Sequence, residues 1–298
     1  MKKLLFILLG AILMISCEKK NEEVATNIEE TFYVTKNDTL PGIFSIDDIR
    51  QVQFSKGNLQ FYASTKTWRF AEFQHNILAE SNKNIAETFN GWIDLFGWGT
   101  GNNPTLSSTN DEDYLTFTEW LAKITSDGSD QSSHWRTLTS TEWLYLFRNR
   151  TNADSLFGLG VVVGLKGIIL LPDEWSIPDG LTFYSSVEQK WQWRNGPTAT
   201  NCGYYKENGV SDTYNLNNYS FIEWQRMDTA GAVFLPAAGY REGTELYNIG
   251  ECGYYWASTP YGIDDARNVY FGLHGLGPVY SDYRHCGLSV RLVCEICE

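Results

Sequence analysis

Side chains suited to contacting a ligand are concentrated near the C-terminus, in residues 268–274 and 279–285. Both stretches are rich in Tyr, Arg, His and Asp, which combine large contact area, a low entropic cost of ordering and hydrogen-bonding groups. We therefore predict that loops within residues 256–285 bind a protein or a glycan without a metal ion. The alternative is that this Tyr-rich segment packs on its own domain. The predicted ligand-binding residues are Trp256, Asn268, Tyr270, His274, Tyr280, Asp282, Tyr283, Arg284 and His285.

Signatures of catalysis are weak in this sequence. It contains no GxSxG nucleophile motif, no Walker loop and no dinucleotide-binding fingerprint. Asp and Glu are numerous, so a carboxylate pair for glycoside hydrolysis is an alternative. The sequence does not indicate which two carboxylates would form that pair. We predict that the protein is not an enzyme and has no catalytic residues, with an oxidase or a hydrolase as the alternative.

Metal-ligating patterns are weak as well. The four His residues lack ligand spacing, and Cys294 and Cys297 form a lone CxxC without two further zinc ligands evident in the sequence. Acidic residues within 172–174 and 264–265 offer the oxygen ligands that calcium prefers, although solvated loop carboxylates explain them more simply. We predict no metal and no cofactor, with calcium as the alternative. The five cysteines besides Cys17 allow at most two intramolecular disulfides.

The N-terminus has the pattern of a bacterial lipoprotein signal peptide. Lys2 and Lys3 precede an apolar run, residues 4–15, which is too short to cross a bilayer comfortably. Ser16 and Cys17 end this run, and a small residue before Cys is similar to a lipobox. We predict cleavage before Cys17 and lipidation of its thiol. An ordinary secretory peptide that happens to contain a Cys is the alternative.

The remaining chain divides into a flexible acidic tether, residues 17–44, and one domain, residues 45–298, after the signal peptide of residues 1–16. The formal net charge of −13 becomes about −15 once Lys2 and Lys3 are removed. Such an acidic body disfavours nucleic acid as a partner and disfavours a basic membrane-binding patch. We therefore predict that the protein contacts the membrane through its lipid anchor only.

Strand signals dominate the predicted domain. Aromatic residues form 15% of the chain and turn residues are frequent, which is typical of a loop-rich domain that contains β-strands. Alternating apolar residues over 52–61 predict a hairpin, and residues 167–172 and 231–236 predict two buried strands, each ended by Pro. The tetrapeptide CGYY at residues 202–205 recurs at 252–255, but the similarity extends no further, so a repeat array is not predicted.

Helix signals are fewer and local. Residues 139–142 and 220–223 each form a capping box, in which a hydroxyl and a Glu carboxylate satisfy free amides at a helix N-terminus. Gly231 is a suitable stop signal for the second helix. A third, weaker helix is predicted over residues 114–124. The Trp residues in these segments are most simply core anchors.

Several motifs resemble those of formylglycine-generating-enzyme-like domains and of the related Fibrobacter major-paralogous-domain family. The resemblance covers most of residues 45–294 and is carried by four motifs in the order that those families show. It implies an α+β, C-type-lectin-like fold with short twisted strands, two or three helices and long loops. The motifs are residues 134–143 (HWRTLTSTEW), 234–241 (FLPAAGYR), 253–259 (GYYWAST) and 287–293 (GLSVRLV).

The resemblance leaves the function open, because this fold hosts enzymes, lectins and protein binders. The thiol pair that holds copper in formylglycine-generating enzymes has no counterpart in residues 256–271, and the calcium-site motifs of sugar-binding C-type lectins are absent. In retroelement-diversified proteins of this fold, the variable binding surface occupies the place of residues 268–285. The acidic tether resembles surface-export signals of Bacteroidetes lipoproteins. We therefore expect an outer-membrane lipoprotein that binds an extracellular protein or glycan, with a fimbria or envelope-assembly component as a further alternative.

Overall fold

The folded body begins earlier than the sequence predicted, at Asp38. Leu40 is 2% exposed, and the Phe44 ring is fully buried with its centroid 5.0 Å from that of Phe54. Residues 38–44, predicted to be tether, therefore belong to the body, whereas Cys17 and the predicted signal peptide lie outside the described residues. This computed structural model describes residues 38–120, 135–194, 203–206, 214–273 and 275–296.

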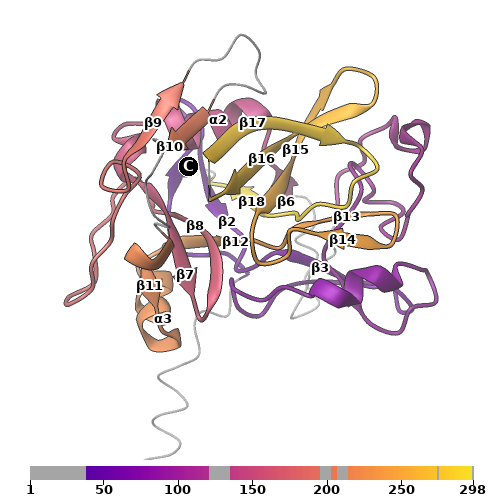
Figure 1. Cartoon of the computed structure of the whole chain (residues 1–298), viewed down its shortest axis with the longest axis horizontal. Coiled ribbons are helices and arrows are strands. Elements are labelled where there is room, and N and C mark those ends of the chain that lie inside the picture. The colour runs from indigo at the N-terminus through magenta and orange to yellow at the C-terminus, as the bar shows by residue number, and fades with distance from the viewer. Residues whose placement is uncertain (1–37, 121–134, 195–202, 207–213, 274, 297–298) are drawn as a thin grey trace, which may run out of the picture. The chain divides into compact units, whose positions relative to one another are not determined.

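Strands from the two ends of the body pair in one sheet (Figure 1). Val293 near the C-terminus pairs antiparallel with Phe54 near the start of the body. Val52 and Phe54 alternate with more exposed neighbours, and this period of two places both in the main hydrophobic core. In spatial order the strands are β1 (Phe44–Ser45), β2 (Gln51–Phe54), β18 (Leu292–Glu295) and β6 (Trp135–Thr137).

A five-stranded antiparallel sheet contains most of the predicted ligand-binding segment. Tyr255, Val269 and Phe271 point into the main core from one face of this sheet. Tyr254 and Trp256 point from the other face into a second core cluster. In spatial order the strands are β15 (Gly253–Tyr261), β16 (Asp265–Gly272), β17 (Gly275–Tyr283), β10 (Gly203–Lys206) and β9 (Trp191–Arg194).

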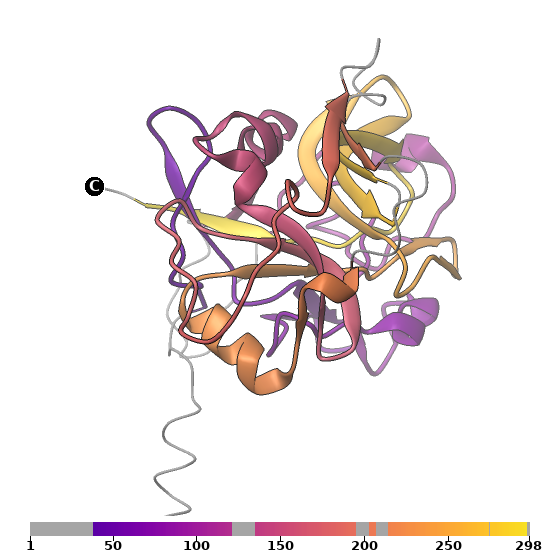
Figure 2. The same cartoon turned by 60° about the vertical axis from the view of Figure 1, so that its left-hand side comes forward.

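The two predicted buried strands exist and pair with each other, Phe234 opposite Ile169. Helix α3 (Phe221–Thr229) packs Trp224 and Met227 into a third core cluster with residues of their sheet. Figure 2 shows this helix, in orange, beside the strands. The helix starts at its predicted capping box and is followed by Gly231, whose φ of +99° suits glycine. The sheet contains β11 (Asn218–Tyr219), β7 (Phe157–Val162), β8 (Leu165–Leu170) and β12 (Val233–Pro236).

Short elements complete the body, and its mixed sheets with few short helices confirm the α+β class. Helix α2 begins at the capping box predicted for residues 139–142. No helix in the described part of the chain is long and apolar enough to cross a membrane. The remaining elements are α2 (Ser140–Leu144), η1 (Ala79–Asn84), η2 (Asp111–Tyr114), η3 (Tyr145–Asn149), η4 (Ala153–Ser155), η6 (Tyr214–Leu216), β3 (Leu59–Tyr62), β4 (Thr67–Phe70), β5 (Trp92–Ile93), β13 (Tyr240–Glu242) and β14 (Glu245–Tyr247).

Two sequence predictions about local structure are wrong. The hairpin predicted over residues 52–61 does not form, because β2 pairs with β1 and β18 while β3 pairs with β4 and β5. The helix predicted over residues 114–124 is also absent up to Trp120, where the described segment ends, since only the short η2 precedes it. Trp120 is nevertheless a fully buried core residue, as its size and apolar neighbours indicated.

Candidate functional site

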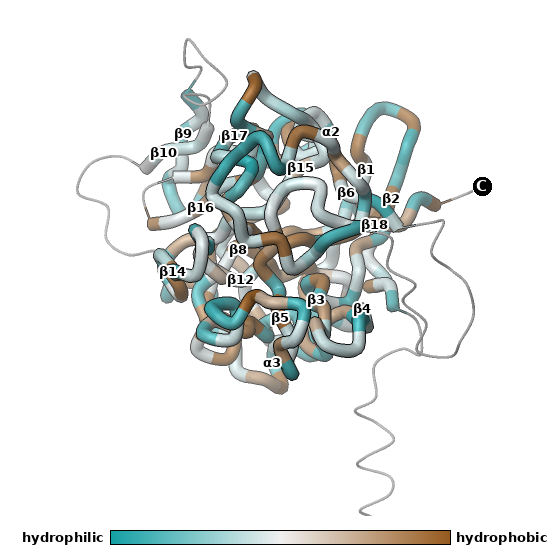
Figure 3. Tube along the Cα trace, turned by 90° about the vertical axis from the view of Figure 1, so that its right-hand side faces the viewer, coloured by the Kyte–Doolittle hydropathy of each residue, from teal (hydrophilic) through white to brown (hydrophobic). Residues whose placement is uncertain are grey.

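The predicted ligand-binding segment consists mainly of strands rather than loops. Strands β15, β16 and β17 occupy most of residues 256–285, and only short turns join them. Because side chains alternate between the faces of a strand, half of the segment points into the main core. The prediction of a loop-built surface is therefore wrong, and the candidate site lies instead on the face of these strands that is turned away from the main core and toward the second core cluster. Figure 3 shows β15, β16 and β17 from this side of the molecule.

Five Tyr rings form a continuous cluster on and beside this face, which we call the tyrosine cluster. Tyr270 is central, with its ring centroid 5.2 Å from that of Tyr254 and 5.3 Å from that of Tyr280. Tyr240 extends the cluster from β13, at 5.2 Å from Tyr254, and stacks on Tyr247 of β14 at 5.0 Å. Tyr247 is 43% exposed and Tyr254 is 8% exposed, so the rings range from solvent to core.

A carboxyl group and an amide lie beside these rings. Asn268 of β16 donates from Nδ2 to Oδ2 of Asp282 on β17 across 3.0 Å. Burial raises the pKa of Asp282 to about 7, and the nearby charge of Asp265 adds to this effect against the hydrogen bond from Asn268. Asp282 is close enough to influence the pKa of Tyr280 in turn. The pair thus offers an acceptor whose charge changes near neutral pH, and within the described residues the buried Asn268 Oδ1 has no partner.

Trp256 borders this site within the second core cluster and is closed to a ligand. Its side chain is fully buried, and its Nε1 donates to the carbonyl oxygen of Phe96 across 2.7 Å. In β15 it lies opposite Asn268 of β16, so the two side chains are neighbours on the same face of the sheet. The prediction of Trp256 as a ligand-contacting residue is therefore corrected: it is a core anchor.

The last predicted residues are divided between structural roles and solvent. Arg284 is 5% exposed, because its guanidinium donates to the carbonyl oxygens of Asp265 and Gly262, and it is a structural residue. His285 is 6% exposed, with Nδ1 2.8 Å from Oδ1 of Asp111. Tyr283 stacks on the His285 ring and is 57% exposed. His274 lies outside the described residues.

Three members of the tyrosine cluster were missed by the sequence prediction. Tyr240 and Tyr247 come from the β13–β14 hairpin, and Tyr254 precedes the predicted segment by two residues. The recurring CGYY tetrapeptide was the available signal, because residues 203–205 and Tyr254 belong to strands of the same sheet. The recurrence ends after four residues, however, and does not by itself indicate a shared sheet.

The cysteines near this site are thiols in the described structure. Cys252 and Cys286 are not in disulfides, and Cys202 and Cys297 lie outside the described residues. Burial raises the pKa of Cys286 to about 12, which keeps it as a protonated and unreactive thiol at neutral pH. The Cys252 Sγ lies 3.9 Å from the Tyr270 hydroxyl. These thiols therefore pack around the tyrosine cluster rather than forming a nucleophilic centre.

The acidic segments considered for calcium do not gather ligands. Asp173 accepts from the Ser45 amide across 2.7 Å and from Arg150 Nη1 across 3.1 Å, so each of its oxygens has a protein partner. Across the residues that the structure describes, no group of three or more His, Cys, Asp or Glu side chains is arranged to hold a metal ion.

Comparison with known proteins adds one match. Residues 198–293 match the model of a family described as a domain of unknown function (DUF8237). No curated protein and no solved structure matches the chain. The matched segment includes strands β15, β16 and β17 and every member of the tyrosine cluster. The candidate site therefore falls wholly within the segment shared with that family.

Proposed function

We propose that this protein binds an extracellular glycan through the tyrosine cluster and the Asn268–Asp282 pair. The observation that carries the proposal is the placement of this hydrogen-bonded amide and carboxyl group beside three Tyr rings of the same sheet and a fourth from β13. A sugar ring has apolar faces that pack on aromatic rings, and its hydroxyls require both donors and acceptors. Asp282 supplies an acceptor through its second oxygen and, when protonated, a donor, while the buried Asn268 holds the carboxyl group in place by donating to its other oxygen.

A protein ligand is the second candidate, favoured by the hairpin between β15 and β16. Its tip exposes Ile263, which is 78% exposed, and Tyr261, which is 37% exposed, and the neighbouring Tyr283 is 57% exposed. Large exposed aromatic and aliphatic residues are frequent anchors of protein interfaces. Here the ligand would contact the hairpin tip in addition to the tyrosine cluster.

The wider context of the proposal is a lipid-anchored protein at the bacterial cell surface with a C-type-lectin-like domain. It is supported by the lipobox-like sequence at Cys17, the four motifs of the resemblance and the pairing of the terminal strands β2 and β18. An oxidase or hydrolase on the same fold is the runner-up. It is disfavoured by the absence of a poised thiol or metal-ligand group among the described residues.

Glycan binding is expected to depend on the tyrosine cluster. The full-length protein, purified in detergent, is applied to a glycan array and to a panel of immobilised extracellular matrix proteins. For a glycan found this way, Tyr280→Ala is expected to weaken binding about tenfold, because one stacking surface is lost. Affinities are measured by isothermal titration calorimetry.

The control is Tyr184→Ala, which removes an exposed Tyr far along the chain from the cluster. Equal affinities of wild type and Tyr280→Ala for every bound glycan would reject the tyrosine cluster as the site. If the protein bound only immobilised proteins, and Ile263→Ser weakened that binding, the ligand would be a protein that contacts the hairpin tip. Cleavage or oxidation of an array glycan would favour the enzyme.

The affinity for a glycan is also expected to rise with pH. The pKa of Asp282 is about 7, so the carboxyl group is mainly protonated at pH 6 and mainly an acceptor-only carboxylate at pH 8. Charge-assisted hydrogen bonds from hydroxyls to the carboxylate are stronger than neutral ones. Titrations at pH 6, 7 and 8 are expected to show several-fold tighter binding at pH 8, and this trend should vanish in Asp282→Asn.

A further inference from the structure

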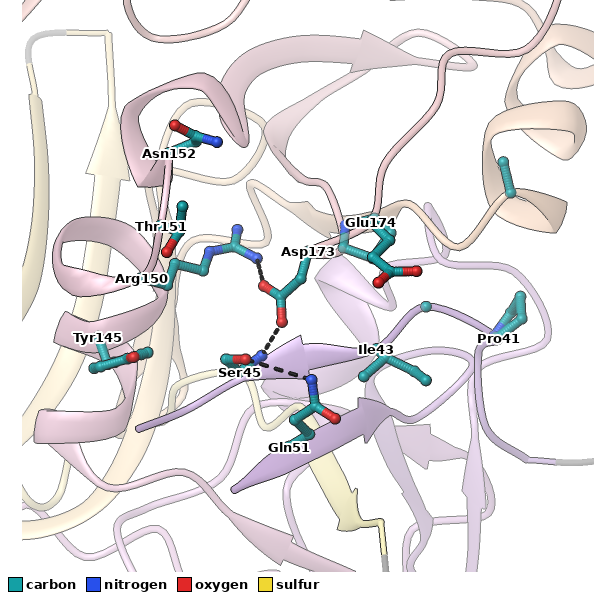
Figure 4. Close-up of a pocket in the computed structure, with 13 residues that line it drawn as sticks. Pro41, Ile43, Ser45, Gln51, Tyr145, Arg150, Thr151, Asn152, Asp173 and Glu174 are labelled. Carbon is teal, nitrogen blue, oxygen red and sulfur yellow. Dashed lines mark hydrogen bonds and ion pairs between the residues drawn. The ribbon is translucent and has the colours of Figure 1, made fainter. Parts of the chain in front are cut away.

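A cavity of about 500 Å³ lies outside the candidate site, between β1, the turn after η3 and the segment that follows β8 (Figure 4). Its volume is within the range of small-molecule sites in proteins. Figure 4 shows Arg150 and Asp173 at its centre, Thr151 and Asn152 on the left, and Glu174, Ile43 and Pro41 on the right. The walls are therefore mainly polar, with an aliphatic strip.

The one cation in the wall is not available to a ligand. Arg150 donates from Nε to the carbonyl oxygen of Leu146 and from Nη1 to that of Leu171, and Nη1 also contacts Asp173. Its Nη2 points to the carbonyl oxygen of Leu156 at 3.4 Å, and the side chain is only 1% exposed. All three guanidinium nitrogens are thus engaged, so an anionic ligand would find no free cationic donor here.

The free charge in the wall is negative. The Glu174 side chain is exposed, and among the described residues it has neither an ion-pair nor a hydrogen-bond partner. The Tyr145 hydroxyl is directed toward Asp48, with its oxygen 3.2 Å from Oδ1 of that residue. The cavity thus combines an unneutralised carboxylate, a Tyr side chain and the exposed aliphatic side chain of Ile43, which is 42% exposed.

We propose that this cavity is a second binding site, which takes a small aliphatic amine. A primary ammonium group has three donors and no acceptor, so it complements Glu174 and the spare acceptor capacity of Asp173. A hydrocarbon stem of a few methylenes then lies along Ile43 and Pro41. This site is independent of the tyrosine cluster, since no residue is shared between them.

The test is isothermal titration calorimetry of the full-length protein with cadaverine, a five-carbon diamine, beside 1-pentanol and pentanoate of the same stem length. Cadaverine is expected to bind saturably, and pentanol and pentanoate at least tenfold more weakly. Glu174→Gln is expected to weaken cadaverine binding about tenfold. The matched control Glu87→Gln, at another exposed Glu, should leave it unchanged.

Because Glu174 is exposed and unpartnered in the described structure, its replacement should leave the fold intact, and circular dichroism checks this. No saturable binding of cadaverine at millimolar concentrations would overturn the proposal. Equal affinity for pentanol, or an unchanged affinity in Glu174→Gln, would overturn it as well.

Discussion

Glu142→Gln is expected to lower the free energy of unfolding by about 3 kcal/mol, because it neutralises a buried carboxylate that two partly exposed Arg side chains share. The Glu142 side chain is 4% exposed and accepts from both terminal nitrogens of Arg136, across 2.9 and 2.8 Å. Arg50 contacts the same carboxylate at 3.1 Å. Burial raises the pKa of Glu142, but the hydrogen bonds from Arg136 and Thr139 outweigh it and hold the pKa below its usual value.

The network joins elements that are far apart in the sequence. Arg136 belongs to β6 and Glu142 to α2, while Glu295 of β18 accepts from Arg136 Nη2 across 2.7 Å. Glu142 also closes the capping box of α2 by accepting from the Thr139 amide across 2.8 Å. A neutral Gln leaves two guanidinium groups partly unpaired and replaces one acceptor oxygen with a donor.

A matched control exists in the second capping box. Glu223 has the same position in α3 and accepts from the Ser220 amide, but it has no Arg partner at ion-pair distance in the described structure. Glu223→Gln should therefore lower the free energy of unfolding by no more than about 1 kcal/mol. Urea denaturation at pH 7 measures both variants. Equal losses would show that the cap, rather than the network, accounts for the effect.

Asp282→Asn is expected to stabilise the protein at pH 8 while weakening ligand binding. The pKa of Asp282 is raised from 3.8 to about 7 by burial. Its contribution to stability is therefore complete below about pH 4 and is lost as the pH rises through 7. At pH 8 the wild type holds a desolvated carboxylate that the variant lacks, so the variant should be more stable by roughly 2–4 kcal/mol.

Other buried groups titrate in the same pH range and also contribute to the pH dependence of stability. Burial raises the pKa of Asp94 and of Asp228 to about 6, so both act in the same direction as Asp282. Burial lowers the pKa of His75, which opposes them as the pH falls. Asp282→Asn should therefore keep part of the wild-type dependence of unfolding free energy on pH. Unfolding free energies at pH 5 and pH 8 test this prediction, with Asp264→Asn, at an exposed Asp, as the control. If the unfolding free energies of wild type and Asp282→Asn changed equally between these pH values, Asp282 would not have the raised pKa.

Elements encoded by adjacent residues could be predicted from the sequence. Both capping boxes form as expected, because the hydroxyl and the carboxylate involved are three residues apart. Gly231 follows α3 as a stop, since only a residue that tolerates positive φ suits that position. The concentration of ligand-contacting residue types near the C-terminus also led to Asn268 and Asp282, which do meet.

Partners and faces of strands could not be predicted in this way. Alternation in residues 52–61 identifies two strands but not their neighbours, and the partner of Phe54 is Val293 rather than residue 59 or 61. Likewise, the alternation of side chains along a strand places Tyr255 and Trp256 on opposite faces of the sheet. It does not show that both faces of this sheet are covered by other residues. The tyrosine cluster needed Tyr240 and Tyr247, which the β13–β14 hairpin brings from outside the predicted segment.

The pairing of β2 with β18 has a consequence for how the protein folds during synthesis. Roughly 240 residues separate the two strands, so the ladder has a very high contact order and closes late. At about 5–20 residues per second, β2 waits roughly 10–50 s after its own translation for its partner. During that interval the edge of β2 that later binds β18 has no native partner, and a nascent chain halted before Leu292 would retain this aggregation-prone edge.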